Sequence, residues 1–143
     1  MLRYLLASLM ILTLATPAQA QVHQQEMREK QCRYQWVDPG TWTAKEERRT
    51  ALCVLARWPV PGGWTEFRSV IGCESGWSRF AYNPAGPYVG LGQHSESSWP
   101  GRVAQYSPPL WRLRPQWFNS RTMLTITARM AHSMGWSPWS CAA

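Results

Sequence analysis

Residues 73–93 read CESGWSRFAYNPAGPYVGLGQ, and this stretch decides the fold that we expect. It starts at the end of a pattern with the spacing i, i+3, i+4 and i+7, formed by Phe67, Val70, Ile71 and Glu74. Side chains with this spacing share one face of an α-helix. Glu74 is therefore predicted to lie on the buried face of a helix, near its C-terminal end.

Glu74 is the one acidic residue in this stretch. A carboxylate on an apolar face is costly to keep ionised, and the negative end of the helix dipole adds to that cost. Both effects favour the protonated carboxyl group that a general acid needs near neutral pH. The alternative is a structural carboxylate that points to water or pairs with Arg79.

Helix signals precede this stretch. Thr43-x-x-Glu46 has the form of a capping box and predicts a helix to about Arg57. Its predicted buried stripe has four members: Ala51, Leu52, Leu55 and Trp58. Residues 59–63 (PVPGG) predict a loop, and Thr65 is predicted to cap the helix that contains Glu74.

Beyond residue 75, Asn-Pro and Gly-Pro pairs predict a loop to residue 88, followed by a short extended piece at 89–93. Ser95 or Ser97 is predicted to cap a short helix that ends at Pro100-Gly101. Asn119 or Ser120 is predicted to cap a last helix that runs to about residue 134. Its expected core stripe consists of Met123, Thr127, Met130 and Met134.

The first twenty residues have the pattern of a secretory signal peptide. They contain Arg3, an apolar run at residues 5–15 and a small-x-small site at residues 18–20. An uncleaved anchor is the alternative, although the apolar run is short for a membrane span. Cleavage would leave 143 − 20 = 123 residues, which is enough for one domain. We therefore expect export to the periplasm or the medium, with no stable membrane span after cleavage.

All four cysteines follow this segment: Cys32, Cys53, Cys73 and Cys141. Export makes two disulfides the expected outcome, with three connectivities open. A bridge between Cys32 and Cys53 would tether the N-terminal segment to the first helix. The histidines, His23, His94 and His132, are scattered, so we expect no metal site and no cofactor.

The expected mature chain carries 14 Lys+Arg against 8 Asp+Glu, a net charge of +6. A basic exported protein is attracted to polyanions, of which the bacterial cell wall and nucleic acid are candidates. The basic residues are dispersed and form no nucleic-acid motif, so the sequence favours the wall. Most of the ten tryptophans are expected to fill the core, while Trp77 and Trp99 are candidates for stacking on sugar rings.

Most glycosidases use two carboxylates. The other acids occupy polar, turn or helix-surface contexts in the sequence: Glu26, Glu29, Asp38, Glu46, Glu47, Glu66 and Glu96. Glu96 is the one nearest the motif on its C-terminal side, and it is expected to be exposed. A single acid suffices when the substrate supplies its own nucleophile, as N-acetylmuramic acid can through its acetamido group and then its 6-hydroxyl.

The series E-S-G-W at 74–77, A-Y-N-P-x-G at 81–86 and G-L-G-Q at 90–93 resembles that of the lytic transglycosylase family with a goose-type-lysozyme-like fold. The likeness is strong over about 73–102 and weaker to residue 136. It implies a mainly α, lysozyme-like α+β domain at 64–143, with a catalytic helix, a short β element, a cleft and disulfide staples. Residues 21–63 would be an extension with one helix packed on it.

The resemblance also implies roles for individual residues. Glu74 would be the acid and then the base, and Ser75 would support its end of the helix. The strand beside the cleft would contain Gly90, Leu91 and Gln93, and Cys73 would pair with Cys141. Trp77, Tyr88 and Trp99 complete the predicted substrate-binding set, and peptidoglycan glycan strands are the expected partner.

The chain departs from the family pattern at two places. Gly92 stands where a larger apolar residue is common, and residues 131–135 read AHSMG in place of an element with a tyrosine that faces the catalytic acid. Tyr82, Tyr88 and Tyr106 are candidates to replace it. Three functions therefore stay open: a transglycosylase, a lysozyme-type hydrolase and a non-catalytic wall-binding protein, with secretion-apparatus or envelope partners undetermined.

Overall fold

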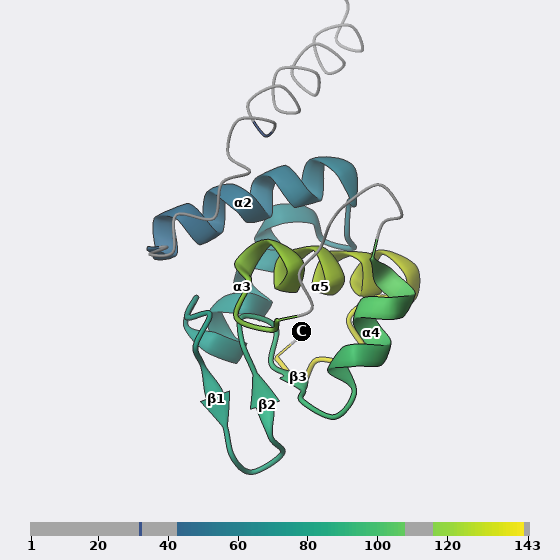
Figure 1. Ribbon diagram of the computed structural model, residues 1–143. Coiled ribbons are helices and arrows are strands. Elements are labelled where there is room, and N and C mark those ends of the chain that lie inside the picture. Colours follow the sequence, from purple (N-terminus) through teal and green to yellow (C-terminus); the bar gives the residue numbers. More distant parts are fainter. Residues whose placement is uncertain (1–31, 33–42, 108–115, 142–143) are drawn as a thin grey trace, which may run out of the picture.

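The computed structural model describes residue 32, residues 43–107 and residues 116–141. In these ranges the chain forms a mainly helical α+β domain (Figure 1). Its helices are α2 (Ala44–Arg57), α3 (Gly63–Ser75), α4 (Trp99–Tyr106) and α5 (Ser120–Met134). Within the described ranges, no helix combines the length and the apolar character needed to cross a bilayer. The predicted signal peptide, His23, Glu26, Glu29 and Asp38 lie outside these ranges.

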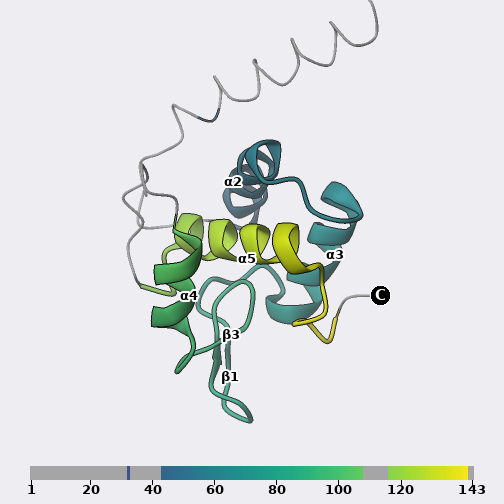
Figure 2. The same cartoon turned by 90° about the vertical axis from the view of Figure 1, so that its right-hand side faces the viewer.

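Helix α5 is the centre of the domain, with α2, α3, α4 and the sheet arranged around it (Figure 2). Asn119 caps it as predicted, because its side-chain oxygen accepts a hydrogen bond from Thr122 N at 3.0 Å. The core stripe predicted for this helix was too narrow, and its last member, Met134, is not buried. Nearly every side chain from Thr122 to Ala131 is buried, whereas Met134 is 47% exposed. A helix that is covered on all sides has this pattern.

Helix α2 begins with the predicted capping box. Thr43 N donates to Glu46 Oε2 at 2.6 Å, and Glu46 N donates to Thr43 Oγ1 at 3.4 Å. The predicted burial of Leu52 is wrong, since this side chain is 47% exposed. The buried stripe is instead Glu47, Thr50, Ala51 and Val54.

Glu47 was expected on the helix surface and is buried, with 1% of its surface exposed. It lies four residues before Ala51, and therefore on the same helical face. Its Oε1 accepts a hydrogen bond from Ser120 Oγ at 2.5 Å, which joins α2 to the first residue of α5. This hydrogen bond satisfies one oxygen of the buried carboxyl group and so offsets part of the cost of burying it.

Helix α3 starts earlier than predicted. Its N-cap is Gly62, with φ of 72°, so Thr65 lies inside the helix and does not cap it. The two glycines at 62–63 let the chain turn directly out of the preceding loop and into the helix. The predicted buried residues Phe67, Val70 and Ile71 are fully buried, as expected.

The sheet has three short antiparallel strands in the order β1 (Tyr82–Asn83), β2 (Tyr88–Val89) and β3 (His94–Ser95). Tyr82 pairs with Val89, and Val89 pairs with His94. The predicted extended piece at 89–93 is wrong beyond Val89. Residues 90–93 form the turn between β2 and β3, because Gly90 and Gln93 have φ values of 71° and 45° that reverse the chain.

Helix α4 was predicted to end at Pro100-Gly101, but it begins there. Pro100 occupies the first turn, where its missing N–H leaves no helical hydrogen bond unmade. Ser98 is the N-cap residue and makes no side-chain capping bond, so neither Ser95 nor Ser97 caps this helix. Buried Trp99 and Tyr106 join α4 to the hydrophobic core.

Candidate active site

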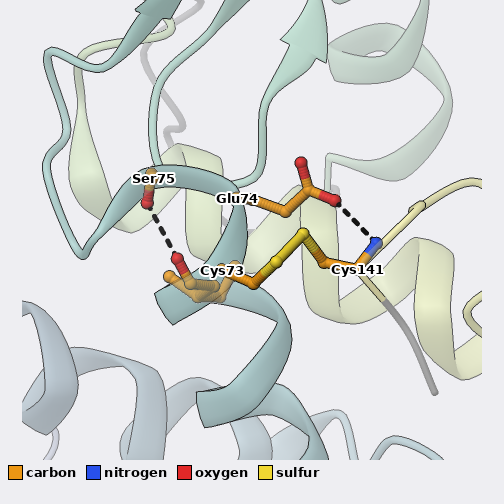
Figure 3. Close-up of a disulfide and its surroundings, with 5 residues drawn as sticks. Cys73, Glu74, Ser75 and Cys141 are labelled. Atoms are coloured by element: carbon orange, nitrogen blue, oxygen red, sulfur yellow. Dashed lines mark hydrogen bonds between the residues drawn. A yellow bond between two sulfur atoms is a disulfide. The ribbon is translucent and has the colours of Figure 1, made fainter.

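Glu74 lies in the last turn of α3, one residue before the helix ends. Its side chain is partly buried, and its Oε1 accepts a hydrogen bond from Cys141 N at 3.3 Å. Figure 3 shows the second carboxylate oxygen pointing away from Cys141. Ser75 Oγ donates to Ile71 O at 3.0 Å, so its side chain is bonded within its own helix turn and not to Glu74.

Both predicted disulfides are present. Cys32 pairs with Cys53 on α2, and Cys73 pairs with Cys141 across 68 residues of sequence. Cys73 and Cys141 thus join the chain terminus covalently to the residue before Glu74 (Figure 3). The Glu74 carboxylate is therefore positioned by a covalent bridge and by a hydrogen bond to the same residue of the C-terminal segment.

Replacing both Cys73 and Cys141 with serine is expected to lower the free energy of unfolding by about 4 kcal/mol, since a loop of this length is released in the unfolded chain. Urea titration measures the loss. The matched control is the double serine variant of Cys32 and Cys53, whose 21-residue separation predicts a loss of about 3 kcal/mol. A smaller loss for the Cys73–Cys141 bridge than for the control would contradict the expectation.

The turn between β2 and β3 holds the predicted glycine and glutamine motif. Gly90 N donates to Ala81 O at 2.8 Å, and Gln93 Nε2 donates to Gly90 O at 2.9 Å and to Ala81 O at 3.4 Å. Gln93 therefore holds the turn together through its side chain. Leu91 is fully buried, so it supports the turn from the core and presents no surface to a substrate.

The C-terminal segment connects this turn to Glu74. Trp139 Nε1 donates to Gly92 O at 2.8 Å, and two residues later Cys141 binds both Cys73 and Glu74. Residues 139–141 thus link the turn at 90–93 to the end of α3 that contains Glu74. Trp139 was not predicted as a site residue, although its position in the closing WSPWSC sequence was the available signal.

Gly92 is required by close packing of this turn against α5. A Cβ atom there would collide with Thr127 Oγ1 and would lie 3.0 Å from His94 Nε2. In the family that the motif resembles, a larger apolar side chain is common at this position. Here the side chains of Thr127 and His94 fill the space that it would need.

Gly92→Ala is therefore expected to lower the free energy of unfolding by about 1–3 kcal/mol, since the buried neighbours must move. Gly101→Ala is the matched control. A Cβ at Gly101 meets nothing within 4 Å, and alanine in a helix is favourable by up to about 1 kcal/mol. Thermal or urea unfolding compares the two, and equal stabilities would refute the packing explanation.

His94 forms a buried polar network behind the turn. Arg102 NH1 lies 2.5 Å from His94 Nδ1, and Thr127 Oγ1 lies 2.8 Å from His94 Nε2. An arginine only donates, so Nδ1 is the acceptor and Nε2 carries the proton that it donates to Thr127. Burial, with a smaller contribution from the Arg102 charge, lowers the pKa of His94 to about 3. His94 is therefore neutral at physiological pH.

The other predicted substrate-binding side chains lie apart. Trp99 is 4% exposed and packs against His94 with ring centroids 5.3 Å apart, so it is a core residue. Trp77 is 5% exposed and lines a hollow on another face of α3. Tyr88 keeps 42% of its surface exposed on β2, where it pairs with Asn83 of β1. Tyr106 is buried in the core.

The remaining acids of the described ranges have other positions. Hydrogen bonds from Thr43 in the capping box lower the pKa of Glu46. Glu47 binds Ser120, Glu66 lies in the first turn of α3, and Glu96 is exposed as predicted. Glu74 is thus the acid, among those described, that the C-terminal segment holds through Cys141.

Comparisons with protein-family models, with curated protein sequences and with solved structures find no match to this chain. Among the described residues, no group of three or more His, Cys, Asp or Glu side chains is arranged to hold a metal ion.

Proposed function

We propose that the protein is an exported peptidoglycan-cleaving enzyme with a lysozyme-like domain, in which Glu74 is the single acid and base. The observation that carries the proposal is the placement of Glu74. It is a partly buried carboxylate at the end of α3, held by Cys141 N in the same C-terminal segment that bonds through Trp139 to the turn at 90–93. A carboxylate held in this way by rigid elements has the fixed geometry that proton transfer requires.

In the first step, the protonated Glu74 carboxyl group donates its proton to the glycosidic oxygen between N-acetylmuramic acid and N-acetylglucosamine. The bond from C1 of the muramic acid to that oxygen breaks. The acetamido oxygen of the same sugar attacks C1 and replaces the missing enzymic nucleophile. N-acetylglucosamine leaves with a free 4-hydroxyl group, and Glu74 is left as a carboxylate.

In the second step, the Glu74 carboxylate removes the proton from the 6-hydroxyl group of the muramic acid. The 6-oxygen attacks C1 and displaces the acetamido oxygen, which gives a 1,6-anhydro ring. Glu74 regains its proton, and no water is consumed. Among the described acids, Glu46 is engaged by Thr43, Glu47 is engaged by Ser120 and Glu96 is exposed, which supports this substrate-assisted route over a two-carboxylate hydrolysis.

Two features support an exported wall enzyme as the context of this chemistry. The two disulfides fit an oxidising compartment. The excess of Lys+Arg over Asp+Glu, 15 against 8 in the whole chain, favours attraction to the anionic groups of the bacterial wall. Periplasm and medium both meet these conditions.

The proposal is tested by incubating the purified protein, with both bridges intact, with insoluble peptidoglycan whose stem peptides carry a dye. Release of soluble dye-labelled glycan fragments by the wild-type protein is the expected result. A folded protein that binds the wall and releases no fragments would contradict the enzymatic proposal and favour a glycan-binding protein.

A further inference from the structure

A hollow of about 560 Å³ lies on the face of α3 that is turned away from Glu74. We call it the Trp64–Trp77 pocket. Its lining residues come from α2, from α3 and from the two residues after α3: Arg48, Trp64, Thr65, Arg68, Ser69, Gly72, Gly76 and Trp77. Its volume falls within the range of about 300–1,000 Å³ that is typical of small-molecule sites.

The pocket and Glu74 occupy opposite sides of one helix. Successive residues of an α-helix are rotated by about 100°, so Gly72 and Glu74 point about 200° apart. Three other lining residues lie three, four or seven positions before Gly72 and therefore share its helical face: Thr65, Arg68 and Ser69. The buried residues Phe67, Val70 and Ile71 lie on the face of Glu74. A ligand in the pocket would therefore leave Glu74 free.

The apolar wall of the pocket is the half-buried Trp64, and Trp77, which is 5% exposed and part of the hydrophobic core, packs behind it. The rings of Trp64 and Trp77 lie 5.9 Å apart at an angle of 50°. Trp77 has a φ of 64°, a left-handed conformation that costs a residue with a side chain about 1–2 kcal/mol. Together with Gly76 at φ of 59°, it turns the chain back, so that the indole lies over Gly72. Strained backbone of this kind is concentrated at binding sites.

The polar wall of the pocket is cationic. The Arg48 guanidinium lies over the Trp77 ring, 5.5 Å from its centroid, and Arg68 is on the neighbouring turn of α3. No acidic residue is among the lining residues. A guanidinium stacked on an indole keeps its in-plane N–H donors for a bidentate bond to a carboxylate. The Thr65 and Ser69 side chains add hydroxyl groups at the rim.

We propose that the Trp64–Trp77 pocket is a second, non-catalytic glycan site that binds a carboxylate-bearing amino sugar. The Trp64 indole takes the apolar face of the sugar ring, the hydroxyl groups bind its polar edge, and the arginines bind the carboxylate. The source of this ligand rests on the proposed function, because N-acetylmuramic acid carries a lactyl carboxylate, which is free on glycan strands from which the stem peptide has been removed. A second site on the same polymer raises the local concentration of bonds at Glu74.

Binding is measured through the indole N–H signals of Trp64 and Trp77 by NMR, in the Glu74→Gln protein with both bridges intact. N-acetylmuramic acid is the probe, N-acetylglucosamine is the same sugar without the carboxylate, and lactate is the carboxylate without the sugar. We expect saturable shifts of both indoles with N-acetylmuramic acid and at least about tenfold weaker binding of the other two. Equal binding of N-acetylglucosamine or of lactate would overturn the proposal.

Two pairs of variants that remove the same positive charge distinguish binding in the pocket from non-specific attraction of the basic protein to anions. Arg48→Gln with Arg68→Gln is expected to weaken N-acetylmuramic acid binding by about tenfold or more. Lys45→Gln with Arg49→Gln removes the same charge from exposed positions of α2 that do not line the pocket, and it should leave binding unchanged. Equal effects of the two pairs would overturn the proposal.

The experiments distinguish failure of the Trp64–Trp77 pocket proposal from failure of the proposed enzymatic function. Arginine-dependent binding of N-acetylmuramic acid in a protein that cleaves no peptidoglycan would retain the pocket and remove the proposed enzyme. Cleavage by wild type without indole shifts at the pocket would retain the enzyme and remove the second site. Cleavage is measured on wild type and binding on Glu74→Gln, and a folding defect of the variant would be visible in its NMR spectrum.

Discussion

Glu74→Gln is expected to lower the rate of peptidoglycan cleavage by about 10³-fold or more, with the fold intact. The substitution removes the proton that the first step donates and the base that the second step needs. Glutamine keeps the shape of the side chain and retains an oxygen that can accept the hydrogen bond from Cys141 N. The substitution should therefore lower the cleavage rate and leave the free energy of unfolding unchanged.

The rate of fragment release and urea unfolding of the same preparation separate these two effects. Glu96→Gln is the matched control, because Glu96 is an exposed acid just after β3 that we assign no role. It should cleave at the wild-type rate. A Glu74→Gln protein that retains more than about a tenth of the wild-type rate would show that another group supplies the proton.

Acidification is expected to destabilise the protein through His94, by about 2 kcal/mol between pH 7.5 and pH 5. Burial lowers the pKa of His94 from its ordinary 6.5 to about 3 in the folded state. Below pH 6.5 the unfolded chain binds a proton that the folded chain does not. The stabilisation is therefore complete above pH 6.5 and is lost as the pH falls toward 3.

The free energy of unfolding of wild type and of His94→Gln, measured by urea titration from pH 7.5 to pH 5, tests this expectation. Between pH 7.5 and pH 5, the free energy of unfolding of the variant should fall by about 2 kcal/mol less than that of wild type, whatever the stability of the variant at pH 7.5. If His94→Gln does not fold, NMR titration of the wild-type His94 ring decides, and a ring that gains a proton above pH 5 would contradict the expectation.

Local signals predicted much of the helical structure. The Thr43–Glu46 capping box and the Asn119 cap act within four residues, and the sequence contains both partners of each. The stripe of Phe67, Val70 and Ile71 was equally readable, because one helical period determines it. The start of α4 was misplaced, because proline both ends helices and occupies their first turn.

The candidate site was predictable only in its pieces. The motifs around Glu74 and Gln93 are visible in the sequence, but their meeting depends on Trp139 bonding to Gly92 across 47 residues. The burial of Glu47 depends likewise on Ser120, 73 residues away. Such contacts have no local signature, since propensity and periodicity describe one element at a time.

The central claim is tested most directly by the mass of the glycan fragments that the wild-type protein releases from peptidoglycan. The account predicts fragments that end in 1,6-anhydromuramic acid, one water lighter than products of hydrolysis, and none from Glu74→Gln. Fragments with reducing ends would contradict this account. They are products of hydrolysis, in which a second group places a water molecule, whereas the substrate-assisted route consumes no water.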